Sequence, residues 1–551
     1  MSKKLINFWP LALLLILTLL LRIFKIEELF YFTYDEAIPA FVGRRLILWQ
    51  HIPLIGGVTP FGFHLAPYFY WFYAVLLFFG KLNPIIWGYA GAVIALITTF
   101  LMYKIGESLG SKKLAVTAAI FWTFSFLANL YDRHLWALYW GPLISLLILM
   151  SLYKIITSSA SPTSSSVIPA PCLPAGRKGA GIHSKAIDKF TYLLGTTIAL
   201  GIHADPSNLA FLVLAFVVWA IYKLPIKKST FVALGLILFS FLPLVIFDLR
   251  HDFANTRPVI EFWSQGRNNP NLDIQKLVDN SLLFPRAFTR LIYTFGDNQI
   301  VKQYSYCRNY VLEKFNAIPW YFVMATIVIV LTFMILNIRK NKHSFSSNRN
   351  QPVTNLITIL LILYFVGIQT YGTIFRADVF EHYITGLFAV FLLILAKVVS
   401  YLPRNLWLVA LAVFITLNLH KLLTTQNSQG LTYKREAIAY TMQQVGDRPF
   451  SLDSLSTCWK LNGYRYLFAV FGREPVKSYV DPNFAYLYGT TPVAEKHPQT
   501  VVAFVVHDFA PETEEFYKRY TLLKSHEVKS TLFGIIEVII MDNSTGWFEK
   551  S

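Results

Sequence analysis

The chain has 551 residues, of which 55% are hydrophobic and only 15% are charged, and its net charge is +18. Soluble domains carry roughly 25% charged residues and lack apolar runs of about 20 residues, so this composition excludes a soluble or disordered chain and indicates a polytopic membrane protein. In a soluble protein such a positive charge would suggest nucleic acid binding, but here we expect it to mark one side of the bilayer, with no nucleic acid partner.

Eleven apolar segments are predicted to span the membrane as helices. The first follows Lys3 and Lys4 and is not followed by a small-residue cleavage site, so we interpret it as an uncleaved span rather than a signal peptide. The predicted spans cover residues 8–24, 85–103, 114–130, 135–153, 190–203, 207–222, 229–247, 318–337, 353–375, 383–400 and 405–421.

Segment 66–80 is apolar but short, and aromatic residues crowd its first half, so it is predicted to lie in the membrane interface. If it does not span and the N-terminus is inside, the cytoplasmic segments carry 19 lysines and arginines against two acids. The positive-inside bias therefore favours eleven spans. It places the first loop (27–84), the large loop (248–317) and the chain after the last span outside.

Two stretches differ in composition from the predicted transmembrane domain, 1–421. Residues 157–189 include a serine-rich, low-complexity run and are predicted to form a flexible cytoplasmic insertion. Residues 430–551 are richer in charge and alternate helical and strand patterns, so they are predicted to form a small extracytoplasmic α/β domain. Its predicted elements are the helices Leu431–Val445 and Pro511–Leu523 and the strands Val501–Val506 and Phe533–Ile540.

Polar residues gather at the predicted outer ends of the spans, although they are far apart in sequence. Charged groups near span ends are costly unless they are paired or functional, so these clusters are expected to converge at one site. The clusters are Tyr34-Asp35-Glu36, Tyr131-Asp132-Arg133-His134, His203-Ala204-Asp205, Asp248-Leu249-Arg250-His251-Asp252, Arg376-Ala377-Asp378 and Glu381-His382-Tyr383.

Each cluster also has a structural interpretation. Asp132 and Arg133 could form an interfacial ion pair, and His203 could be hydrogen-bonded to the backbone. Arg250 and Arg376 could be ordinary interfacial charges. The adjacent acids Asp35 and Glu36 follow a run of aromatic residues and are harder to explain structurally, so they favour function.

The chemistry that fits these groups is transfer of a sugar from a lipid phosphate. A carboxylate at the membrane surface can accept a proton from an acceptor hydroxyl, and arginines can stabilise the phosphate leaving group. No Walker A, Rossmann or metal-protease motif is present, and Cys172, Cys307 and Cys458 lack metal-ligand spacing. Nucleotide-driven transport therefore has no support in the sequence, and no cofactor is expected.

Five motifs, by their sequence and their order along the chain, resemble those of the GT-C glycosyltransferases. The resemblance is to the protein O-mannosyltransferase and aminoarabinose-transferase type, including bacterial members with an RgtA/B/C/D-like domain. The resemblance covers about residues 1–420. It rests on Tyr34-Asp35-Glu36, on His64-Leu65-Ala66-Pro67-Tyr68, on Tyr103-Lys104-Ile105-Gly106-Glu107-Ser108-Leu109-Gly110, on Tyr131-Asp132-Arg133-His134 and on Phe380-Glu381-His382-Tyr383.

The resemblance implies a multi-pass enzyme of GT-C fold in a bacterial plasma membrane. It would move a sugar from a polyprenyl-phosphate donor to an extracytoplasmic glycan, lipid or protein acceptor, with inversion at the anomeric carbon and without a metal. It implies that Asp35 is the catalytic carboxylate and that Glu36 assists it. The expected substrate-binding residues are Arg133, Asp132, His134, His64, His203, Arg250, Arg376, His382 and Tyr383.

Two other functions remain open at the level of sequence. A transporter or flippase of lipid-linked sugars is also polytopic, but transporters usually show internal repeats and polar residues at the membrane midplane, and neither is evident here. A non-catalytic scaffold that presents residues 430–551 would not need an outer loop as long as 248–317, with its own aromatic and charged residues.

Overall fold

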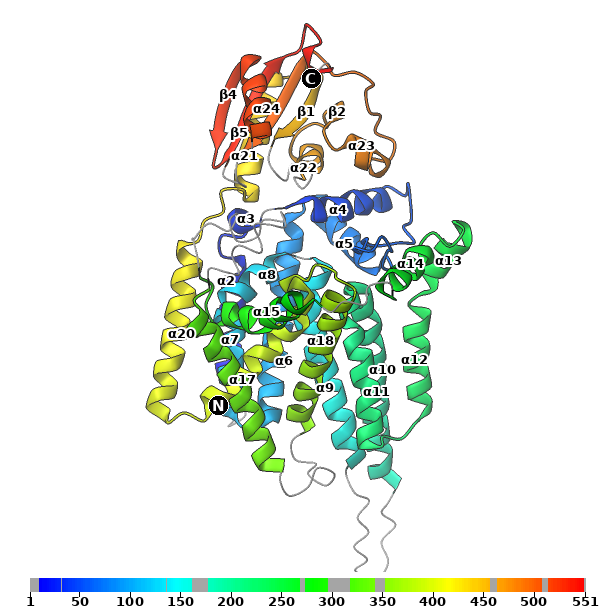
Figure 1. Ribbon diagram of the computed structural model, residues 1–551, viewed down its shortest axis with the longest axis vertical. Helices are drawn as coiled ribbons and strands as arrows, with labels where there is room; N and C mark the ends of the chain where they lie inside the picture. Colours follow the sequence, from blue (N-terminus) through cyan, green and yellow to red (C-terminus); the bar gives the residue numbers. More distant parts are fainter. Residues whose placement is uncertain are drawn as a thin grey trace, which may run out of the picture.

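Eleven helical segments, some of them bent, form the main body of the protein in the computed structural model (Figure 1). The structure describes residues 9–30, 32–134, 136–160, 177–267, 273–295, 318–341, 352–455, 463–507 and 514–549. The segments are α2 (Trp9–Ile23), α6 (Ile85–Leu109), α7 (Lys112–Phe124) with α8 (Phe126–Arg133), α9 (Gly141–Ala160), α10 (Arg177–Ala204), α11 (Leu209–Tyr222), α12 (Lys228–Phe239) with α13 (Leu242–Arg250), α17 (Trp320–Asn341), α18 (Pro352–Gln369), α19 (Phe388–Ser400) and α20 (Arg404–Thr424).

Each of the eleven predicted spans coincides with one of these helical segments. Within the described ranges, seven helices are long and apolar enough to cross a membrane, or eight if the bent pair α7 and α8 is one span. The protein is therefore a multi-pass membrane protein, and the number of eleven crossings stays a prediction. The helix α5 (Tyr68–Phe79), which covers most of the predicted interfacial segment, has only 12 residues and is too short to cross.

Two predicted loops are partly helical. The large loop 248–317 contains α14 (Thr256–Arg267) and the amphipathic helix α15 (Ile274–Ile292), which buries one face against the bundle. At the predicted insertion 157–189, α9 continues to Ala160 and α10 begins at Arg177, so both flanks are helical. Residues 161–176 lie outside the described residues, as do residues 296–317 of the large loop.

The helices α7 and α8 meet at a bend of 60°. Ser125 causes the bend because it both ends α7 and caps α8, and its hydroxyl donates to the carbonyl of Leu291 at 2.8 Å. The side-chain amide of Asn129 donates to the carbonyls of Thr123 and Ser125, on either side of the bend. The bend lets α8 turn across the end of the bundle.

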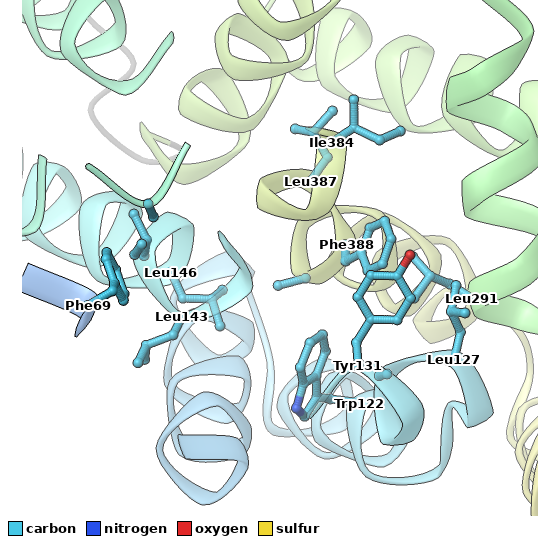
Figure 2. Packing of buried hydrophobic residues seen from close by; sticks show 14 of the residues in the cluster. Phe69, Trp122, Leu127, Tyr131, Leu143, Leu146, Leu291, Ile384, Leu387 and Phe388 are labelled. Atoms are coloured by element: carbon cyan, nitrogen blue, oxygen red, sulfur yellow. The ribbon is translucent and has the colours of Figure 1, made fainter. Parts of the chain in front are cut away.

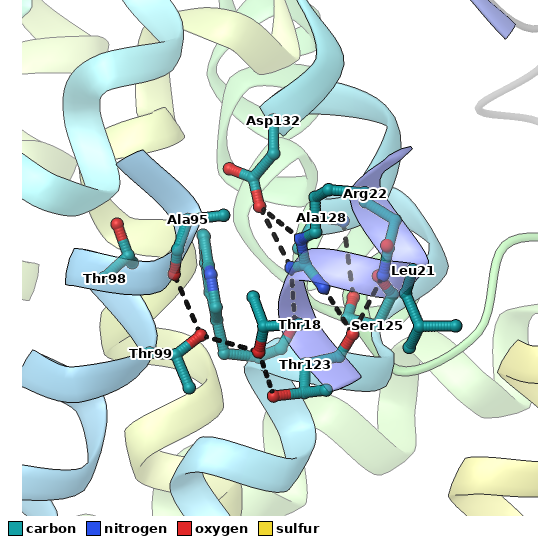
Figure 3. A network of polar contacts seen from close by, with 12 residues as sticks. Thr18, Leu21, Arg22, Ala95, Thr98, Thr99, Thr123, Ser125, Ala128 and Asp132 are labelled. Carbon is teal, nitrogen blue, oxygen red and sulfur yellow. Dashed lines mark hydrogen bonds and ion pairs between the residues drawn. The ribbon is translucent and has the colours of Figure 1, made fainter. Parts of the chain in front are cut away.

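A buried ion pair joins α2 to α8 (Figure 3). The guanidinium of Arg22 donates to Oδ2 of Asp132 at 3.0 and 2.9 Å and to the carbonyl of Trp122 at 2.8 Å, and Arg22 is fully buried. One turn below, the hydroxyl of Thr18 lies 3.1 Å from that of Thr99 and 2.8 Å from that of Thr123. Polar contacts of this kind hold membrane helices together where the hydrophobic effect does not favour association.

Around this polar layer the bundle is packed with aliphatic and aromatic side chains. Figure 2 shows Trp122 and Tyr131 of the bent segment close to Phe388 at the start of α19. The rings of Tyr131 and Phe388 are 5.2 Å apart, and Phe388 is fully buried. The core therefore extends to the end of the bundle at which α8 lies.

The C-terminal part forms a five-stranded mixed sheet with helices, as predicted for an α/β domain. Its strand order is β2-β1-β3-β5-β4; β1 pairs in parallel with β2 and β3, and β5 pairs antiparallel with β3 and β4. Strands β1, β2 and β4 were not predicted. The elements are α21 (Leu431–Val445), β1 (Phe450–Leu455), α22 (Tyr464–Phe471), β2 (Lys477–Ser478), α23 (Asp481–Phe484), β3 (Thr500–Val506), α24 (Glu514–Ser525), β4 (Glu527–Phe533) and β5 (Ile536–Asp542).

The sheet covers one end of the helical bundle. Figure 1 places α8, α5 and α13 near that end, together with α3 (Ile26–Leu29) and α4 (Tyr34–Ile47), which lies across it. The polar clusters that were predicted to lie on the outer side occur on these elements and on the chain segments that contact them. They therefore share one end of the molecule.

The Arg22–Asp132 pair predicts a large effect on stability. Arg22→Met leaves a carboxylate buried without its partner and should lower the free energy of unfolding by about 3–5 kcal/mol. Replacing both residues, as in Arg22→Met with Asp132→Leu, should be less harmful than Arg22→Met alone. Unfolding of the detergent-solubilised protein by heat or denaturant measures both effects.

A surface pair provides the control. Arg435 and Glu27 are 3.1 Å apart with side chains 48% and 42% exposed, and breaking such a pair costs about 0–1 kcal/mol. If Arg22→Met is no less stable than Arg435→Met, the buried pair does not hold the bundle together.

Candidate functional site

The two adjacent acids lie on the first turn of α4. Thr33 caps this helix, so both acids belong to its first turn. The backbone N–H of Thr33 donates to Oε2 of Glu36 at 2.8 Å, and the Thr33 hydroxyl donates to the same oxygen. Glu36 is 3% exposed, whereas Asp35 is only half-buried.

His134 contacts Glu36 from the end of α8. Its Nδ1 lies 3.2 Å from Oε1 of Glu36, and its ring stacks on Phe30 at 5.3 Å. Burial alone would raise the pKa of Glu36, but the hydrogen bond and charge of His134 and the hydrogen bonds from Thr33 outweigh it, so the pKa lies below its ordinary value. Glu36 is thus a fixed anion within the protein.

A second buried carboxylate, Glu381, lies on the 3-10 helix η5 (Glu381–Leu387). The hydroxyl of Tyr131 donates to its Oε1 at 2.9 Å, and the guanidinium of Arg290 donates to its Oε2 at 2.7 Å. Neither Glu381 nor Arg290 was predicted to bind substrate. The amphipathic period of α15 could have revealed Arg290, and Glu381 directly precedes the predicted His382.

Aromatic residues connect the two carboxylates. The ring of Tyr139 lies 4.3 Å from that of Tyr131 and 6.4 Å from that of His134. Trp136 lies 5.5 Å from Tyr139 and 5.2 Å from His382. Glu36, His134 and His382 are therefore brought into one continuous polar and aromatic cluster, which we call the α4–α8 cluster. It comprises Glu36, Tyr131, His134, Trp136, Tyr139, Arg290, Glu381, His382 and Tyr383.

Tyr383 is the edge of this cluster. Its ring contacts His382 at 4.6 Å and Tyr371 at 5.8 Å. Tyr371 in turn contacts Phe61 of the first loop at 5.1 Å. The first loop thus reaches the cluster at two places, through Glu36 and through Phe61.

His64 and His203 form a separate group beside α5. Nδ1 of His64 lies 3.1 Å from the carbonyl of Gly56, and its backbone N–H donates to Asn255. His203 lies 3.0 Å from the hydroxyl of Ser240 through Nε2, and the backbone N–H of Ala66 donates to its Nδ1 at 3.4 Å. Both histidines hold the first loop in place in this structure, in agreement with the structural interpretation of His203.

Asp132 and Arg133 also have structural partners. Asp132 pairs with Arg22 rather than with the adjacent Arg133. The guanidinium of Arg133 is fully buried and donates to the carbonyls of Asn129, Leu21 and Phe24. It therefore closes the C-terminal end of α2, whose carbonyls lack helical partners. In this structure the described contacts of Arg133 are therefore structural, and substrate binding by Arg133 stays a prediction.

The two remaining arginines are exposed. Arg250 ends α13, whereas Arg376 lies on the loop that leads to the α4–α8 cluster. The carbonyl of Arg376 accepts a hydrogen bond from Nζ of Lys276 at 2.8 Å, and its backbone has a left-handed φ of 55°. A non-glycine residue in this conformation is costly and is often found at functional sites.

Among the residues that the structure describes, no group of three or more His, Cys, Asp or Glu side chains is placed to hold a metal ion. The expectation of a metal-independent reaction remains a prediction.

Comparisons with known proteins reveal a shared fold. No family model and no curated protein matches the sequence. ArnT from Cupriavidus metallidurans bound to undecaprenyl phosphate aligns over 98% of this chain and 98% of its own, with a TM-score of 0.53 at 10% identity. The archaeal oligosaccharyltransferase AglB from Archaeoglobus fulgidus, solved with an inhibitory peptide and a dolichol-phosphate, covers 91% of this chain and 70% of its own. Its TM-score is 0.43 at 12% identity. The chain therefore has the fold of the GT-C membrane glycosyltransferases, as the sequence motifs predicted.

Thr33 provides a test of the Glu36 environment. An ionised carboxylate whose pKa is lowered from 4.5 stabilises the folded state above that pH, and the contribution is lost as the pH falls through the lowered pKa. Thr33→Val removes one hydrogen bond to this anion and should lower the free energy of unfolding by about 1.5–3 kcal/mol at pH 7. The difference from wild type should shrink below pH 4.5.

Thr441→Val is the matched control, because Thr441 is fully buried and its hydroxyl donates only to the helical carbonyl of Ala437. Its effect on thermal unfolding should not vary with pH. An equal pH response of the two variants would contradict the ionised state of Glu36.

Proposed function

We propose that the protein is an inverting glycosyltransferase that moves a sugar from a polyprenyl-phosphate donor to an extracytoplasmic acceptor. The observation that carries the proposal is the α4–α8 cluster: two carboxylates of the first loop, one half-buried and one held as an anion, adjoin a buried polar and aromatic network at one end of a GT-C fold. ArnT, which shares this fold, was solved with undecaprenyl phosphate. The basic residues at the other ends of the predicted spans support an outer location of the cluster.

Asp35 is our candidate for the general base. Both oxygens of Glu36 already accept hydrogen bonds from Thr33 and His134, while Asp35, one residue earlier, is more exposed. Asp35 removes the proton from the acceptor hydroxyl as its oxygen bonds to the anomeric carbon. The bond from that carbon to the phosphate oxygen breaks with its electron pair, so polyprenyl phosphate leaves and the configuration inverts.

The phosphate requires cationic groups that reach the cluster. Arg376 lies on its rim beside Lys276, and Arg290 lies within it, paired with Glu381. Arg133 is directed to backbone carbonyls, and Arg250 lies on the exposed end of α13. We therefore assign the donor phosphate to Arg376, with Arg290 as its neighbour in the cluster. His382 and Tyr383 are positioned to contact the sugar.

Asp35→Asn tests the base. The amide keeps the shape of the carboxylate but cannot accept the proton, so turnover should fall by about 10²–10⁴. Glu36→Gln should lower turnover by a smaller factor, because Glu36 positions the loop and does not itself accept the proton. The measurement is release of polyprenyl phosphate from a panel of polyprenyl-phosphate sugars, followed by mass spectrometry.

Glu27→Gln changes another acid of the same loop, one that pairs with Arg435 at the surface, and should leave turnover unchanged. If Asp35→Asn is as active as Glu27→Gln with a donor that the wild type uses, the base is elsewhere.

Arg376→Ala tests the phosphate contact. Loss of a charge-assisted hydrogen bond of about 1.5–3 kcal/mol should weaken donor use by about tenfold or more, and Lys should rescue it only in part. Arg404→Ala, at the exposed start of α20, is the control. Donor kinetics that are the same for both variants would show that Arg376 does not hold the phosphate.

A further inference from the structure

The first loop and helix α21 are joined by main-chain contacts, although they are about four hundred residues apart in sequence. The backbone N–H of Leu431 donates to the carbonyl of Phe30 at 2.7 Å. Nζ of Lys434, one turn further along α21, donates to the carbonyl of Phe32 at 2.8 Å. Phe32 directly precedes Thr33, the residue that caps α4, and Phe30 lies three positions before Thr33.

The amine of Lys434 is buried inside the protein. The residue is 1% exposed, and its Nζ lies 5.3 Å from the centre of the Tyr464 ring. Burial lowers the pKa of Lys434 to about 7, while the negative charge of Glu36 acts in the opposite direction and raises it. A lysine is rarely buried so completely unless it is paired, and here its charge is coupled to Glu36.

Phe32 needs support from outside its own segment. It is fully buried and has a left-handed φ of 34°, a conformation that is costly for a bulky residue. Its ring lies 5.6 Å from that of Tyr466 on α22. A Cβ atom on Gly463 would come within 2.8 Å of the Phe32 ring and 2.9 Å of the Thr33 carbonyl, so only glycine permits this close approach.

We infer that Lys434 is a positioning residue of the proposed active site, and that the C-terminal α/β region is a structural part of that site. By binding the carbonyl of Phe32, Lys434 holds the left-handed turn that sets Thr33, and through it the first turn of α4 with Asp35 and Glu36. The inference rests on the proposed function only where it concerns turnover, because the effect on the loop can be measured without substrate.

The first measurement needs no donor. Lys434→Met keeps the length of the side chain but removes the charge and the hydrogen bond. Hydrogen–deuterium exchange of the full-length protein should become faster for peptides that cover residues 30–40, while exchange in β3 and β5 stays unchanged. Unchanged exchange in the first loop would overturn the inference, whatever the protein catalyses.

Arg435→Met is the matched control. Arg435 is the next residue of α21 and also bonds to the first loop, but its partner Glu27 lies six positions before Thr33 and the pair is half-exposed. It should leave exchange of residues 30–40 as in wild type. If both variants loosen the loop equally, general docking of α21 rather than Lys434 is responsible.

The second measurement is kinetic. Lys434→Met should lower kcat by about tenfold or more, the size of a lost charge-assisted hydrogen bond, and leave KM for the donor within about twofold. In a Glu36→Gln background, Lys434→Met should lower kcat by a clearly smaller factor, because both residues act on the same loop. Independent, multiplicative losses would contradict the inference, whereas a wild-type protein that uses no donor would contradict the proposed function instead.

Discussion

The buried pair of Arg22 and Asp132 fixes the geometry on which the rest of the site depends. The pair joins the end of α2 to α8, and the guanidinium of Arg133 donates hydrogen bonds to free carbonyls at the same end of α2. On the helix α8 held in this way, Tyr131 contacts Glu381, and His134, just after its end, contacts Glu36. Charges buried in a membrane protein are costly unless they are paired, and the carboxylate of Asp132 and the guanidinium of Arg22 offset this cost for each other.

The positions of the helices could be predicted because a membrane span needs a long apolar run, and such runs are visible in the sequence. The bend at Ser125 could not, because its cause is a hydrogen bond to Leu291, 166 positions away. The amphipathic helix α15 was missed for a different reason. Its polar face interrupts the apolar run, so a search for spans does not detect it, although a search for helical period would.

The candidate site was likewise predictable only in part. Asp35, Glu36, His134 and His382 were identified because acids and histidines next to apolar spans are conspicuous, and the structure brings Glu36, His134 and His382 together. The partners of the arginines were not identified. Arg133 and Asp132 are adjacent in sequence, yet each binds elsewhere. Pairing is decided by which helix ends meet, and no local pattern carries that information.

The bond between Lys434 and Phe32 joins residues that are 402 positions apart. During synthesis the N-terminal part of a chain folds first, so the helical bundle can insert long before α21 exists. The turn at Phe32 then lacks its hydrogen bond from Lys434 until α21 has left the ribosome and, in the predicted topology, crossed the bilayer. An unfinished chain would carry all the acids of the first loop without the arrangement seen here, and translocation of the C-terminal region would be the step that completes it.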